Sequence, residues 1–229
     1  MGCIIAMYEA DFGILLSSID SIFKGICITF VICSVSSVLA FLIGSIIFFL
    51  RWCRVKSLNL LVAGAVEFIR NTPLLVQLYI FYKGLPQVGL FLPPLVCAIL
   101  ALSLYTGVYI SETLRSGYSA VPAAQKNAAF ALGFNDLQTF VYVIYPQTFR
   151  FSILPLGSQF INLVKNSTLA SFIAITDLFY VVSQGISDYF RVLEFMVLGV
   201  ALYGITTIVI SCFSNFMHTK YQLNNRERA

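Results

Sequence analysis

Long uncharged apolar runs alternate with short polar stretches along the whole chain. Residues 25–50 and 195–217 contain no charged residue. Each is long enough to cross a bilayer as one helix, which needs about 20 residues. Residues 84–111 are also uncharged, and a proline at the first turn predicts that the helix in this run begins at Pro93 or Pro94.

Two further apolar runs carry polar interruptions. Residues 151–176 are apolar except for Lys165, and residues 57–82 contain Glu67, Arg70 and Pro73. The pattern therefore predicts an all-α integral membrane protein, a single domain over residues 1–229 with five transmembrane helices. Their approximate ranges are 25–50, 60–83, 93–112, 151–175 and 195–217.

The segment before the first span has a helical apolar face. In residues 11–23 this face consists of Phe12, Leu15, Leu16, Ile19 and Phe23. We expect a short helix here that lies on the outer membrane surface before the first span begins.

The basic residues set the expected orientation, because loops rich in Lys and Arg stay in the cytoplasm. With five spans, three basic loops fall on one side: residues 51–56, 115–150 and the tail from residue 218. The other side holds most of the acidic residues. We expect the N-terminus outside, the C-terminus in the cytoplasm, and the chain as a multi-pass protein of a bacterial inner membrane.

Composition supports the membrane assignment and argues against a catalytic or metal centre. The chain is 59% hydrophobic and only 10% charged, which leaves too few charges to cover a soluble domain of 229 residues. Its six cysteines fit no zinc spacing, and we interpret them as free thiols in apolar surroundings. The single histidine, His218, stands alone in a basic tail, so we expect no bound metal, no cofactor and no enzymatic activity in this chain.

The longest expected cytoplasmic loop, residues 117–150, predicts a helical hairpin. Pro122 suits the start of an alanine-rich helix, and Gly133 suits its end, because glycine accepts the left-handed conformation of a helix C-terminus. Asn135 can cap a second helix with Gln138 three residues on, and Pro146 is expected to end that helix. The small side chains suit docking of a soluble partner and packing of the hairpin on its own bundle about equally well.

The hairpin resembles the coupling loop of ABC importer permeases. That motif reads Glu-Ala-Ala, three residues, Gly, nine residues, Ile, one residue, Leu-Pro. This chain has Asn127-Ala128-Ala129, then Gly133, and Val143 to Pro146 at the same spacing. Asn127 replaces the glutamate and Tyr145 replaces the leucine, so the ion pair that the glutamate could form with an ATPase arginine is lost.

Three flanking segments resemble the polar amino acid branch of that family. They are VEFIRNTPLLVQLYIFYKGLP, LSLYTGVYISETLRSGYSAVP and YPQTFRFSILPLGSQFINLVKNSTLASFIAITDL, at residues 66–86, 102–122 and 145–178. The resemblance implies a permease subunit that imports a polar amino acid. It also implies three partners besides membrane lipid: a cytoplasmic ATPase subunit that binds the ATP, a second permease copy or homologue, and an extracytoplasmic solute-binding protein. The chain has no GxxxxGK[ST] phosphate loop of its own, and nothing predicts nucleic acid binding.

Polar residues at membrane depth are costly and so indicate a purpose. Lys165, with Asn166 and Thr168 beside it, is a candidate for the wall of the translocation path; a lysine that reaches the membrane surface or pairs with a carboxylate is the alternative. Gln77 either lines the path or bonds to another helix. Glu67 and Arg70 share a helical face, which favours a structural ion pair or subunit contact over solute binding.

Other kinds of membrane protein fit the sequence less well. A secondary, ion-coupled transporter would need coupling carboxylates near the bilayer midplane, and no acidic residue is clearly placed there. A channel would show a filter-like or repeated pore segment. A membrane enzyme would need clustered His, Cys or carboxylates, whereas the ten acidic residues are scattered.

Overall fold

The computed structural model describes residues 12–53 and 56–226, with side chains described as far as residue 221. The regular secondary structure of these residues is entirely helical. The α-helices are α1 (Gly13–Ser17), α2 (Ile19–Trp52), α3 (Lys56–Asn71), α4 (Leu74–Tyr79), α5 (Leu85–Gln87), α6 (Pro94–Tyr118), α7 (Ala123–Ala131), α8 (Asp136–Thr139), α9 (Tyr145–Asn166), α10 (Leu178–Tyr189) and α11 (Val192–Arg226). Two π-helical turns, η1 (Ile80–Gly84) and η2 (Phe140–Ile144), and a 3-10 helix, η3 (Ser167–Ile173), continue some of these helices.

Three of the described helices, α2, α6 and α11, are long and apolar enough to cross a membrane. A fourth span is possible when α8 to η3 and α10 are taken together as one span bent by 56°. The first, third, fourth and fifth predicted spans therefore coincide with α2, α6, the α9–η3 helix and α11. Five spans and the orientation of the termini stay predictions.

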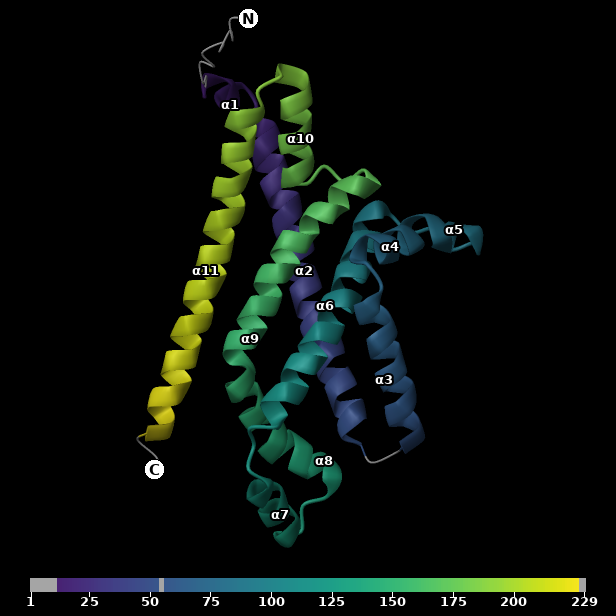
Figure 1. Ribbon diagram of the computed structural model, residues 1–229, viewed down its shortest axis with the longest axis vertical. Coiled ribbons are helices and arrows are strands. Elements are labelled where there is room, and N and C mark those ends of the chain that lie inside the picture. Colours follow the sequence, from purple (N-terminus) through teal and green to yellow (C-terminus); the bar gives the residue numbers. More distant parts are fainter. Residues whose placement is uncertain (1–11, 54–55, 227–229) are drawn as a thin grey trace, which may run out of the picture.

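The predicted second span is interrupted in the structure. Helix α3 ends at Asn71, and α4 begins after Pro73, whose backbone has no N–H to continue the helix. The Gln77 side chain donates hydrogen bonds to the carbonyls of Ile69 (2.8 Å) and Thr72 (3.0 Å), which satisfies two acceptors that the break leaves open. Figure 1 shows α3 alongside the bundle and α5 projecting from it, while α4 between them packs on α6.

The expected surface helix before the first span is shorter than predicted. Only Gly13–Ser17 forms a separate helix, and Ile19 already begins the long helix α2. Residues 1–11 lie outside the described part of the chain. The apolar face that includes Ile19 and Phe23 is therefore the first part of α2, and the exposed Phe23 side chain lies on the outer surface of that helix.

The centre of the bundle is the crossing of α2 and α6. A Cβ atom added to Gly44 would lie 2.7 Å from the Gly107 carbonyl oxygen, and one added to Gly107 would lie 3.0 Å from the Ala40 carbonyl oxygen. Such close backbone approach through small residues is typical of helix pairs in membranes, where burial of apolar surface alone gives little driving force. Helix α9 packs on α6, and α11 packs on α9 and α10.

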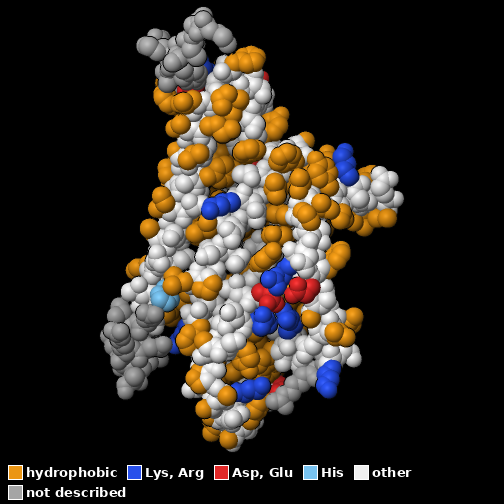
Figure 2. Space-filling view, viewed as in Figure 1, with side chains coloured by type: hydrophobic (Ala, Val, Ile, Leu, Met, Phe, Trp, Pro, Cys, Tyr) orange, Lys and Arg blue, Asp and Glu red, His pale blue; other side chains and the backbone are white. Residues whose placement is uncertain are grey.

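The long axis of the molecule separates two ends with different features. Helix α1 lies at one end, whereas the α7–α8 hairpin and the last turns of α11 lie at the other (Figure 1). Figure 2 shows most of the visible Lys and Arg side chains in the half that carries the hairpin, and apolar side chains spread over the rest of the surface. This distribution supports one basic and one less basic membrane face.

Candidate functional site

The predicted hairpin exists and projects at one end of the molecule. Pro122 is the residue before the first helix, α7, and the Asn127 and Ala128 side chains are exposed on that helix. Ala129 is buried, so it faces inward toward η2, against which α7 packs. Asn127 and Ala128 therefore present small, uncharged side chains outward, while Ala129 holds the helix on the rest of the hairpin.

Gly133 ends α7 in the way that its position predicts. Its φ of +84° lies in the left-handed region. The N–H of Gly133 bonds to the Phe130 carbonyl (3.0 Å), and the N–H of Phe134 bonds to the Ala129 carbonyl (3.1 Å). These two bonds make a Schellman motif, the commonest glycine-dependent helix end. The angle between the two arms of the hairpin therefore depends on a conformation that glycine adopts without strain.

Asn135 caps the second helix of the hairpin with both bonds of a capping box. Its Oδ1 accepts from the Gln138 N–H (2.8 Å), and its own N–H donates to the Gln138 Oε1 (3.0 Å). The two predicted turn signals thus act together, since only Phe134 separates Gly133 from Asn135. The hairpin tip is a short, well-defined connection.

The prediction that Pro146 ends the second helix is wrong. The chain stays helical from α8 through η2 into α9, and Pro146 is the second residue of α9. The wider π-turn of Phe140–Ile144 directly before Pro146 makes room for the proline ring, so the helix continues through it. The second arm of the hairpin is consequently a direct extension of a membrane helix.

The hairpin exposes several large apolar side chains to solvent. They are Leu132 (78% exposed), Leu137, Val141 and Tyr142. Exposed apolar side chains that gather on one small element indicate a contact surface for another protein. We call these four residues, with Asn127 and Ala128, the hairpin surface.

A polar cleft of about 350 Å³ lies between α6 and α9. Each of its lining residues carries a polar group: Tyr105, Thr106, Tyr109, Gln159, Asn162, Lys165 and Asn166. The hydroxyl groups of Tyr105 and Tyr109 lie 3.4 Å apart. A second cleft of about 520 Å³ shares Tyr109 and Gln159 with the first and reaches Glu112 and Arg115, closer to the hairpin. The two clefts together follow one polar face of α6 and α9.

The four residues predicted to line the translocation path fall in different places in the structure, and only two of them line the polar cleft. Lys165 and Asn166 line the polar cleft. Thr168 is not part of its lining; its hydroxyl donates to the Lys165 carbonyl at 2.8 Å within the helix. Gln77 is buried at the break between α3 and α4, where its amide bonds to α3. The cleft residues Gln159 and Asn162 escaped notice in the sequence, although with Lys165 they repeat every three residues, as polar positions on one helical face do.

Glu67 and Arg70 form the predicted pair and belong to a larger ion-pair network. Arg70 lies 3.4 Å from the Glu67 carboxylate and 4.0 Å from Glu112. Glu112 is the centre of the network, because it also pairs with Arg115 (2.9 Å) and with Arg51 of α2. The network therefore ties α2, α3 and α6 together in the half of the molecule that carries the hairpin, where Figure 2 shows a large cluster of red and blue side chains just below its centre.

Comparison with known proteins gives consistent matches. A family model described as "Binding-protein-dependent transport system inner membrane component" matches residues 40–222. The probable glutamine ABC transporter permease protein GlnM of Bacillus subtilis (strain 168) is 35% identical over 183 residues, 80% of this chain and 85% of that protein. The nopaline transport system permease protein NocM of Agrobacterium fabrum is 30% identical over 229 residues, 96% of this chain and 94% of that protein.

A solved structure supports the same relationship at the level of the fold. It is described as the crystal structure of an amino acid ABC transporter with histidines. Its chain superposes with a TM-score of 0.83 and 28% sequence identity, covering 93% of this chain and all of the other. The arrangement of helices described above is therefore the arrangement of a transporter subunit.

Proposed function

The chain belongs to the family of binding-protein-dependent transport system inner membrane components, and we propose that it is the permease subunit of an ATP-driven importer that moves a polar amino acid into the cytoplasm. The observation that carries the proposal is the hairpin. Its Asn127, Ala128, Ala129 and Gly133 occur at the spacing of a coupling loop, and the hairpin that carries them lies at one end of the molecule.

The hairpin suits transmission of force from an ATPase. The capping box and the Schellman motif fix the tip, and the second arm runs without a break into α9, which lines the polar cleft. A movement imposed on the hairpin surface would therefore reach the cleft through one continuous helix. The proposed ATPase supplies the energy by binding and hydrolysing ATP; a second permease, identical or homologous, and an extracytoplasmic binding protein complete the proposed importer.

The polar cleft suits a zwitterionic solute. The Lys165 ammonium can attract an α-carboxylate, and the amide oxygens of Gln159 and Asn162 and the tyrosine hydroxyls can accept hydrogen bonds from an α-ammonium group. The relatives' names mention glutamine and nopaline. These observations support an amino acid as the substrate class and leave the side chain open.

We place the chain in a bacterial inner membrane with five spans, the N-terminus outside and the hairpin in the cytoplasm. Three features of the described residues support this arrangement: three long apolar helices, a bent fourth candidate, and basic residues concentrated at the hairpin end. The α3–α4 segment then supplies the second span as a broken helix whose break is capped by Gln77.

Uptake and co-purification together test the proposal. In cells that express the transporter, depletion of ATP should abolish uptake of the amino acid, while collapse of the proton gradient at constant ATP should leave it unchanged. An ion-coupled secondary transporter would give the opposite result. A cytoplasmic ATPase should also co-purify with the chain in detergent, and Ala128→Arg on the exposed face of α7 should lose it. Thr219→Arg, at an exposed position of α11 beyond the predicted fifth span, should keep it.

A further inference from the structure

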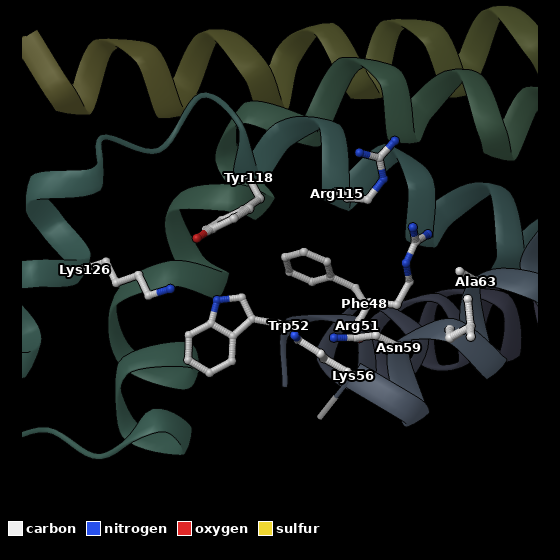
Figure 3. A pocket seen from close by; sticks show the side chains of 10 residues that line it. Phe48, Arg51, Trp52, Lys56, Asn59, Ala63, Arg115, Tyr118 and Lys126 are labelled. Carbon is white, nitrogen blue, oxygen red and sulfur yellow. The ribbon is translucent and has the colours of Figure 1, made fainter. Parts of the chain in front are cut away.

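A second pocket, separate from the polar cleft, lies at the hairpin end of the molecule. It has a volume of about 580 Å³ and is formed where the end of α2, the start of α3, the end of α6 and helix α7 meet. Its lining residues are Phe48, Arg51, Trp52, Lys56, Asn59, Leu60, Ala63, Arg115, Tyr118 and Lys126. Figure 3 shows Lys126 approaching from the hairpin side and Arg51 and Arg115 from the opposite side.

The charge of this pocket is one-sided. Four of its lining residues are cations and none is a carboxylate. Arg51 and Arg115 share Glu112 with Arg70, which in turn pairs with Glu67. Among the described side chains, Lys56 and Lys126 have no carboxylate within 4 Å. The three arginines and two lysines are balanced only by Glu112 and Glu67, which leaves an excess of three positive charges around the pocket. This excess favours an anionic occupant.

Two buried polar atoms of the pocket lining, the Trp52 Nε1 and the Asn59 Oδ1, have no hydrogen-bond partner among the described residues. The Trp52 indole N–H is buried and has no acceptor among the described residues. Figure 3 shows its nitrogen turned toward the interior of the pocket, between Lys126 and Phe48. The Lys126 ammonium lies 5.4 Å from the centre of the Trp52 ring. A buried N–H without an acceptor is destabilising, and an oxygen-bearing ligand here would supply the acceptor.

The remaining lining is apolar and continues onto an exposed surface. Phe48, Tyr118 and Ala63 contribute carbon surface inside the pocket, and Leu60 lines the pocket while 77% of it is exposed. Leu61 beside it is 73% exposed. Helix α2 ends at Trp52 after a long apolar run, so the cations lie where the hydrocarbon core gives way to lipid headgroups.

We propose that this pocket binds the phosphate of an anionic phospholipid, with Lys56, Lys126 and the Trp52 N–H as its principal contacts. Basic pockets between membrane helices on the cytoplasmic side bind such headgroups. The phosphate satisfies the cations and the indole N–H, and the first carbons of the acyl chains pack on Leu60 and Ala63. A free phosphate ion would satisfy the cations but leave the adjoining apolar surface without a partner, so the lining favours a lipid.

The bound lipid would have a mechanical consequence. Lys126 belongs to the hairpin helix α7, whereas Trp52 and Lys56 belong to the ends of α2 and α3. One phosphate contacting all three joins the hairpin to the membrane bundle from the side opposite α9. The inference depends on α2 crossing the membrane and not on the solute or on the direction of transport, so the two proposals can fail separately.

Native mass spectrometry of the full-length chain in mild detergent tests the proposal, both alone and with its ATPase partner. The probes are phosphatidylglycerol, phosphatidylcholine and inorganic phosphate. At about 1 kcal/mol for each basic residue near an anionic surface, Lys56→Gln with Lys126→Gln should weaken phosphatidylglycerol binding by about 30-fold. Trp52→Phe, which keeps the ring and removes the N–H, should weaken it by a smaller factor. Lys220→Gln, an exposed cation on α11, is the matched control and should change nothing.

Four results would overturn the proposal. Equal binding of phosphatidylcholine would show that charge does not select the ligand. Inorganic phosphate that competes fully with the lipid would assign the pocket to a free anion. Loss of the lipid when the ATPase binds would assign the cations to a carboxylate of that subunit. An equal effect of Lys220→Gln would show attraction to the basic face as a whole.

Discussion

Substitution of Gly133 tests whether the hairpin turn is needed for coupling. At a φ of +84°, a residue with a Cβ atom is strained, and the space around Gly133 is otherwise open, because an added Cβ meets no atom within 4 Å. Any effect of Gly133→Ala therefore comes from the backbone and not from a clash. The expected cost is about 1–2 kcal/mol, and a β-branched residue in Gly133→Val costs more.

The chain offers a closely matched control at Gly89. This glycine has the same φ of +84°, an added Cβ there also meets nothing, and it ends α5 with the same two backbone bonds: Gly89 N–H to the Pro86 carbonyl and Leu90 N–H to the Leu85 carbonyl. Gly89→Ala and Gly89→Val thus introduce the same strain in the connection between α5 and α6, away from the hairpin. Only the location differs between the two sets of variants.

The assay is uptake of labelled amino acid into proteoliposomes, measured with ATP hydrolysis in the same samples. A cost of 1–2 kcal/mol at the hairpin disfavours its docked shape by about 5- to 30-fold, so Gly133→Ala should lower uptake per ATP hydrolysed, and Gly133→Val should nearly abolish uptake while the protein remains inserted. The Gly89 variants should keep normal coupling. Full uptake by Gly133→Val, or an equal loss in both sets, would refute this reasoning.

Three further predictions concern the ion-pair network, the central helix crossing and the polar cleft. Glu112→Gln removes the shared partner of three arginines and should lower the unfolding free energy by about 1.5–3 kcal/mol. Glu67→Gln changes a side chain that is 64% exposed and should lower it by less than about 1 kcal/mol. Equal shifts in the melting temperature of the two variants would contradict this. Gly107→Val places a Cβ 2.8 Å from Ile43 and should lower the unfolding free energy by about 1–3 kcal/mol or prevent accumulation in the membrane. At Gly204 an added Cβ meets no atom within 4 Å, so Gly204→Val should accumulate normally. Comparable membrane levels of the two variants would be evidence against close packing of α2 and α6. Lys165→Gln removes the cation from the polar cleft and should weaken binding of the amino acid to the purified permease by about 5- to 30-fold, the effect of losing about 1–2 kcal/mol. An unchanged Kd would exclude the ammonium from solute binding.

Local signals explain the parts of the structure that the sequence predicts well. The start of α6 at Pro94, the end of α7 before Gly133 and the cap at Asn135 each depend on one or two neighbouring residues. The spans α2 and α11 follow from long apolar runs, because the bilayer imposes both their length and their composition. Such features need no knowledge of what packs against them.

The failures come from contacts between distant segments and from compensated local breaks. No sequence pattern links Arg51 with Glu112, which are 61 residues apart. Pro146 normally indicates a helix end, but here η2 accommodates it and the helix continues. The polar face of α9 was visible as spacing, yet its partner tyrosines on α6 become part of a cleft only when α6 and α9 pack together.

Photo-cross-linking from the hairpin tip tests the central proposal most directly. A photoreactive amino acid at Leu132, which is 78% exposed on the hairpin surface, should cross-link in intact cells to a cytoplasmic protein that binds ATP. The same group at Phe91, which is 79% exposed near the opposite end of α6, should not cross-link to that protein. If the Leu132→Cys variant instead reacts with thiol reagents that cannot cross the membrane, beyond the reaction of the unsubstituted chain, or if the group at Phe91 captures the ATP-binding protein, the hairpin is not the element on which the ATPase acts.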